Sequence, residues 1–103
     1  MATGEVLSLH QFNDQTVRMR LLDPYGEPMR ETPAQFVIKR RAGVPDDCAM
    51  LVVEATTDDT GWVVFAFDRG DMTFSGRFFY RADSLPGDEV HTHARGRLDV
   101  LPA

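Results

Sequence analysis

The chain has 103 residues, 43% of them hydrophobic and 26% charged, which is the composition of a globular protein and excludes a disordered one. This length predicts a single domain, residues 1–103, with a core that needs no metal or disulfide. The formal net charge of −5, with acidic and basic residues interleaved, argues against nucleic acid as a partner.

The N-terminal sequence and the cysteine content indicate where the protein works. The first five residues carry no charged segment followed by an apolar stretch, so we expect no signal peptide, and no apolar run is long enough to span a membrane. Cys48 is the only cysteine, which rules out an intrachain disulfide, and its apolar neighbours predict a small buried side chain. We therefore expect a protein that works in water, inside a cell or in a particle assembled there.

Apolar residues alternate with polar ones along the chain, which indicates β-strands rather than helices. In residues 15–21, Val17, Met19 and Leu21 would face a core while their neighbours face water. Phe36 is predicted to point inward in the same way. The expected strands cover residues 6–12, 15–21, 34–40, 48–55, 62–67, 76–82 and 89–101.

The segments between these strands have the composition of turns. Residues 56–61 are polar and end in glycine, which predicts a hairpin between the flanking strands. Residues 68–75 are expected to contain a single helical turn, and Gly96 is the expected position of a bulge in the last strand. About seven strands with frequent turns predict an all-β sandwich or small barrel.

Three of the expected strands, 48–54, 62–67 and 76–80, are apolar on both faces. One explanation is that the second face lies beneath the protein's own loops or its N-terminal segment. The other is that a further subunit covers it, because exposed apolar patches mark association surfaces. On this second interpretation the candidate interface residues are Trp62, Val64 and Phe79.

No motif in the sequence indicates catalysis or a bound cofactor. His91 and His93 lie two apart on an expected strand and could both contact one zinc ion, but a third ligand would have to come from elsewhere in the fold. Aspartates in residues 46–47, 58–59 and 68–71 fall in expected turns, where this side chain bonds the local backbone. We therefore expect no enzyme, no cofactor and no metal site.

Several short motifs follow one another along the chain in an order that is typical of one protein family. A strand at residues 14–22 precedes a D-x-x-G-x-P turn at 23–28, and a glycine-aromatic strand at 60–67 precedes another at 76–80. The segment 96–100 reads G-x-L-x-V. In this order the chain resembles the immunoglobulin-like N-terminal domain of phage baseplate upper proteins.

This resemblance implies an immunoglobulin-like antiparallel β-sandwich of about seven strands and a non-enzymatic structural role in a phage tail or baseplate. It implies symmetric copies that bind neighbouring virion proteins through sheet edges and loops. A capsid decoration or head–tail joining protein is an alternative. A carbohydrate-binding module is another, and it would gather Tyr25, Trp62 and Tyr80 on one concave surface.

Overall fold

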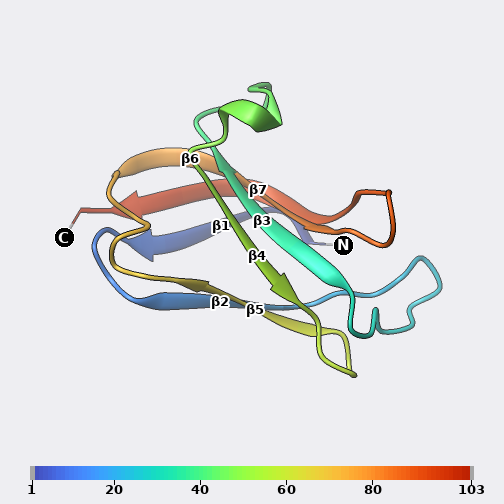
Figure 1. Ribbon diagram of the computed structural model, residues 1–103. Helices are drawn as coiled ribbons and strands as arrows, with labels where there is room; N and C mark the ends of the chain where they lie inside the picture. The colour runs from blue at the N-terminus through green and yellow to red at the C-terminus, as the bar shows by residue number, and fades with distance from the viewer. Residues whose placement is uncertain (1, 103) are drawn as a thin grey trace.

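The computed structural model describes the backbone of residues 2–102 and the side chains of residues 6–102. Within this range the elements are β1 (Ala2–His10), β2 (Gln15–Arg20), β3 (Pro33–Lys39), the 3-10 helix η1 (Asp46–Cys48), β4 (Leu51–Thr56), β5 (Trp62–Phe67), β6 (Gly76–Ser84) and β7 (His91–Leu101). Five strands form one sheet in the order β1-β7-β6-β3-β4, and β2 and β5 form a second sheet that packs against it (Figure 1). No helix among these residues is long and apolar enough to cross a membrane.

The strand arrangement confirms the predicted immunoglobulin-like sandwich. Strands β2 and β5 pair in one sheet as strands B and E do in that fold, and β7-β6-β3-β4 follow the order G, F, C and C′ in the other. The pairs β2–β5, β3–β4, β3–β6 and β6–β7 are antiparallel, but β1 runs parallel to β7. The sequence did not predict this parallel pair, because no local turn connects the two strands and fixes their direction.

The core lies between the two sheets and follows the predicted alternation. Phe36 of β3 is fully buried, and its ring centroid is 5.5 Å from that of Phe65 and 5.4 Å from that of Phe67, both on β5. Tyr80 of β6, in the same sheet as Phe36, stacks on the Phe36 ring with the centroids 5.3 Å apart. Phe36 therefore joins the aromatic side chains of both sheets into one cluster.

The expected hairpin at residues 56–61 is wrong, because β4 and β5 lie in different sheets and this connection crosses between them. The crossing is tightly built. The buried hydroxyl of Thr57 donates to the carbonyl of Met29 at 2.6 Å and accepts from the Thr32 amide at 2.8 Å, which ties it to the β2–β3 loop. Gly61 has φ +84°, and a Cβ there would stand 2.8 Å from the carbonyl oxygen of Leu21.

Three smaller predictions are also wrong. Cys48 is exposed, because Pro45 and the η1 turn delay the strand until Leu51 and leave the thiol outside the sheet. Residues 68–75 hold a turn without a helix, closed by the Asp71 amide bonding the carbonyl of Asp68 at 2.9 Å. The irregularity in β7 lies between Thr92 and Ala94, which pair with Asp83 and Ala82 of β6. Gly96, where the bulge was expected, pairs regularly with Tyr80.

Candidate functional site

Most of the ion pairs among the described residues lie on the outer face of the five-stranded sheet. Alternation turns Phe78, Tyr80 and Ala82 of β6 into the core, so the residues between them face outward. Register then sets Gln35 beside Asp83 on the neighbouring strand. The outward positions of the three central strands are Gln35, Val37 and Lys39 of β3, Arg77, Phe79, Arg81 and Asp83 of β6, and Arg95, Arg97 and Asp99 of β7.

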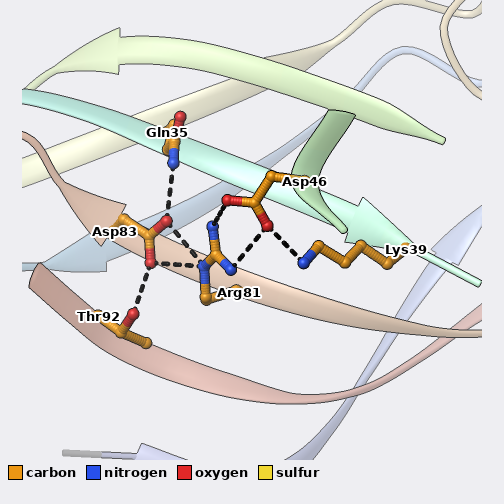
Figure 2. Close-up of polar contacts among 6 residues, drawn as sticks. All are labelled: Gln35, Lys39, Asp46, Arg81, Asp83 and Thr92. Carbon is orange, nitrogen blue, oxygen red and sulfur yellow. Dashed lines mark hydrogen bonds and ion pairs between the residues drawn. The ribbon is translucent and has the colours of Figure 1, made fainter. Parts of the chain in front are cut away.

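Near one end of this face, Asp83, the next-to-last residue of β6, is fully buried and satisfied by three neighbours (Figure 2). Its carboxylate accepts hydrogen bonds from Arg81 Nε at 2.8 and 2.9 Å, from Gln35 Nε2 at 2.8 Å and from Thr92 Oγ1 at 2.9 Å. These donors come from β3, β6 and β7, so one side chain ties three strands together. A buried carboxylate is tolerated when it is paired and hydrogen-bonded in this way.

The same network holds the β3–β4 loop against the sheet. Asp46 of η1 accepts two bonds from the Arg81 guanidinium, at 3.1 and 2.8 Å, and also pairs with the ammonium group of Lys39 (Figure 2). Hydrogen bonds from Arg81 and then Lys39 lower the pKa of Asp46 far below its ordinary value. The Asp46 bonds also raise the pKa of Arg81, so both groups stay charged.

The loop therefore covers part of the sheet's outer face. Val37 is only 2% exposed and Lys39 8%, although both point away from the core. This cover does not extend to the three strands predicted to be apolar on both faces, where Val52, Val64 and Phe79 are 44%, 48% and 40% exposed. Local turn bonding was predicted for all the aspartates, and it holds for Asp58 and Asp71, whereas Asp46 instead pairs with residues of the sheet.

Beside the network lies a groove of about 390 Å³ on the same face. Phe79, which is 40% exposed, stands at this groove together with the guanidinium-bearing residue Arg95. Arg95 is directly opposite Arg81 across the β6–β7 pair. Like charges in this position are unfavourable, and here the two carboxylates at Arg81 offset its charge. The groove thus combines an apolar surface with a positively charged rim.

The three candidate interface residues do not share one surface. Trp62 and Val64 lie on the outer face of β5 in the two-stranded sheet, whereas Phe79 lies on the outer face of the five-stranded sheet, on the opposite side of the sandwich. The Arg18 guanidinium covers the Trp62 ring at 4.4 Å from its centroid. Val64 is 48% exposed, so no loop of the described chain hides this part of β5.

The aromatic side chains that a carbohydrate site would need are also dispersed. Tyr80 is buried in the core and stacks on Phe36. Tyr25 is exposed in the β2–β3 loop, and Trp62 lies on the outer face of β5. The observation that would favour the carbohydrate-binding alternative is therefore not met by these three residues.

The two histidines of β7 take separate partners instead of facing one ion. His91 Nε2 is 2.7 Å from Glu89 Oε2, and His93 Nε2 is 2.7 Å from Ser84 Oγ. Among the described residues no group of three or more His, Cys, Asp or Glu side chains is arranged to hold a metal. Sequence reasoning did not predict the Ser84–His93 contact, which arises from the register of β6 and β7.

A serine hydrogen-bonded to a histidine is the geometry of an activated nucleophile. Ser84, however, is fully buried, so its hydroxyl is not accessible to a substrate in this structure. Asp83, the adjacent carboxylate, is engaged by Arg81 and Thr92 rather than by the imidazole. The pair therefore reads as a buried polar contact that joins β6 to β7.

The buried position of His93 predicts a loss of stability in mild acid. Burial lowers the pKa of His93 below its ordinary value of 6.5, His91 lowers it further, and Asp83 opposes the shift. The unfolded chain therefore binds a proton that the folded protein does not, once the pH falls below about 6.5. Urea unfolding should show a free energy that is steady above this pH and decreases as the pH falls below it.

The matched variant His93→Gln keeps a polar group beside Ser84 and removes the titration. It should flatten the decrease in the free energy of unfolding that begins below pH 6.5. Stabilisation by the carboxylates with lowered pKa, Asp14, Asp46 and Asp58, is lost only at more acidic pH, as the pH falls through and below the ordinary value of 3.8. An equal decrease in the variant and the parent protein would contradict the assignment to His93.

The clearest candidate for a functional surface is thus the groove and ionic network on the five-stranded sheet, with a second exposed apolar position at Val64 on the opposite face. The likeness to phage baseplate proteins stays a prediction from the sequence motifs. No protein-family model matches this chain, and no curated protein matches it.

Proposed function

We propose that this chain is a non-enzymatic structural or adaptor domain of a phage virion, in the tail or baseplate, that assembles in symmetric copies and binds neighbouring virion proteins. The observation that carries the binding role is the outer face of the five-stranded sheet. There the exposed Phe79 borders a groove rimmed by Arg95, on a surface that the Asp83–Arg81–Asp46 network keeps rigid. The virion setting rests on the sequence resemblance alone.

The features of this face suit protein association. Aromatic and arginine side chains contribute most often to the energy of protein interfaces. A partner that buries Phe79 removes apolar surface from water, and the ordered network means that little side-chain freedom is lost on binding. The buried Ser84 hydroxyl supports the non-enzymatic part of the proposal. The virion location is part of the same proposal.

Two glutamate variants on opposite faces test this role. Phe79→Glu and Val64→Glu each add a charge at a position that is 40% and 48% exposed, so both variants should fold. Sedimentation of the purified protein over a range of concentrations should show self-association that Phe79→Glu weakens by about tenfold or more, because the carboxylate must be desolvated in the interface. Val64→Glu should associate like the parent.

The outcomes are separate. A parent protein that stays monomeric at every concentration would contradict assembly in symmetric copies. If Val64→Glu disrupts association and Phe79→Glu does not, the binding surface lies on β5 and the assignment to the groove is wrong. Circular dichroism of each variant confirms that a loss of association is not a loss of fold.

A further inference from the structure

Strand β2 has one edge without a neighbouring strand. It pairs only with β5, in a sheet of two strands within the described chain. The Leu21 amide donates to the Gly61 carbonyl at 2.8 Å, and backbone groups alternate in direction along a strand. The N–H and C=O groups of Thr16, Arg18 and Arg20 therefore point away from β5 toward the free edge.

The sandwich is open beside this edge. A cleft of about 990 Å³ lies between β2 and β7, with Leu7, Tyr80 and Ala94 among its lining residues. The core-facing side chains of β2, Val17 and Met19, are only partly buried beside it. On the partner strand the inward side chains are at most 1% exposed, namely Val63, Phe65 and Phe67.

The solvent-facing side chains at this edge are positively charged. Arg18 and Arg20 point to the solvent side of β2, and both are held in place. Arg18 lies over the Trp62 ring, and Arg20 Nε donates to the Thr60 carbonyl at 3.0 Å. A second copy of β2 docked at this edge would bring the arginines of both copies together, which is unfavourable across a strand pair. The edge is therefore suited to a different, acidic strand.

We propose that the free edge of β2 binds an extended segment of a partner protein as an added strand, in which apolar residues alternate with acidic ones. Its backbone would pair with the free N–H and C=O groups of Thr16, Arg18 and Arg20. The apolar side chains would fill the cleft over Val17 and Met19 and bury what is now partly exposed. The acidic side chains would stand beside Arg18 and Arg20. This inference rests on the proposed protein-binding role and assigns it a second surface and a type of partner.

The inference can be tested with a synthetic peptide in which valine and glutamate alternate. A length of about seven residues matches an ordinary strand. Fluorescence anisotropy of the labelled peptide measures its affinity for the protein. Amide hydrogen exchange should slow at Thr16, Arg18 and Arg20 when the peptide is present. It should change little at Val17 and Met19, whose amides already face β5.

Two controls make the result specific. A peptide of the same composition with proline at its centre cannot complete the backbone pairing and should lose binding. The double variant Arg18→Glu with Arg20→Glu should bind the glutamate peptide about tenfold more weakly and prefer a valine–lysine peptide, because the cross-strand charges are reversed. A two-dimensional NMR spectrum confirms that this double variant is folded.

Failure of this inference differs from failure of the proposed function. The added strand is wrong if a saturating concentration of the glutamate peptide does not slow amide exchange at Thr16, Arg18 and Arg20. It is also wrong if the proline peptide binds as tightly as the glutamate peptide. Phe79→Glu leaves the β2 edge intact, so it should bind the peptide like the parent protein. A peptide whose binding depends on Phe79 occupies the outer groove instead, which also overturns the inference.

Discussion

Replacing Phe36 with alanine is expected to lower the free energy of unfolding by about 3–5 kcal/mol. The side chain is fully buried, and its ring meets Phe65 and Phe67 of the opposite sheet as well as Tyr80 of its own. Truncation removes buried apolar surface and leaves a cavity among rings that cannot easily collapse, since each is fixed by its own strand. Urea unfolding followed by circular dichroism measures the change.

The matched control is Phe79→Ala, which removes the same atoms from an exposed position on the neighbouring strand β6. This substitution should change the free energy of unfolding by about 0.5 kcal/mol or less. Similar losses for the two variants would mean that Phe36 does not join the two sheets as described.

Replacing Asp83 with alanine should be about as costly, again about 3–5 kcal/mol. The variant leaves Arg81 Nε, the Gln35 amide and the Thr92 hydroxyl without their shared buried acceptor. Arg81 retains Asp46, so the loss falls mainly on the ties between β3, β6 and β7. Unfolding in urea gives the size of the effect.

Asp83→Asn separates charge from hydrogen bonding at this position. The amide oxygen can still accept one of these bonds, so the loss should be smaller than for alanine. Asp88→Ala removes an exposed carboxylate from the β6–β7 turn and should change stability by about 0.5 kcal/mol or less. An Asp83→Ala protein as stable as the Asp88 variant would show that the network contributes nothing measurable.

Much of the fold could be predicted from the alternation of apolar and polar residues. This pattern determines which side chains point inward, and it correctly placed Phe36 in the core and Val64 on the outside of its strand. It does not determine which strand lies next to which. The polar segment before Trp62 has the composition of a hairpin turn, yet the connection crosses to the other sheet.

For the same reason the sequence does not show which outer faces share one surface. Val64 and Phe79 were both predicted to lie on a second apolar face, yet they lie on opposite sides of the sandwich. The ionic network could not be predicted from the sequence either, because it depends on which segments lie next to each other. Asp46 and Arg81 are far apart in the sequence, and only tertiary structure brings a loop carboxylate to a guanidinium on β6.

The parallel pairing of β1 with β7 has a mechanical consequence. Ala2 of β1 lies beside Ala94, while His10 lies beside Leu101, so the two chain ends leave the molecule in opposite directions (Figure 1). A pulling force applied between these ends would load the hydrogen bonds of the pair in shear, all at once, instead of peeling them apart one by one. The β1–β7 pair would therefore resist such a force more strongly than two strands that are peeled apart from one end.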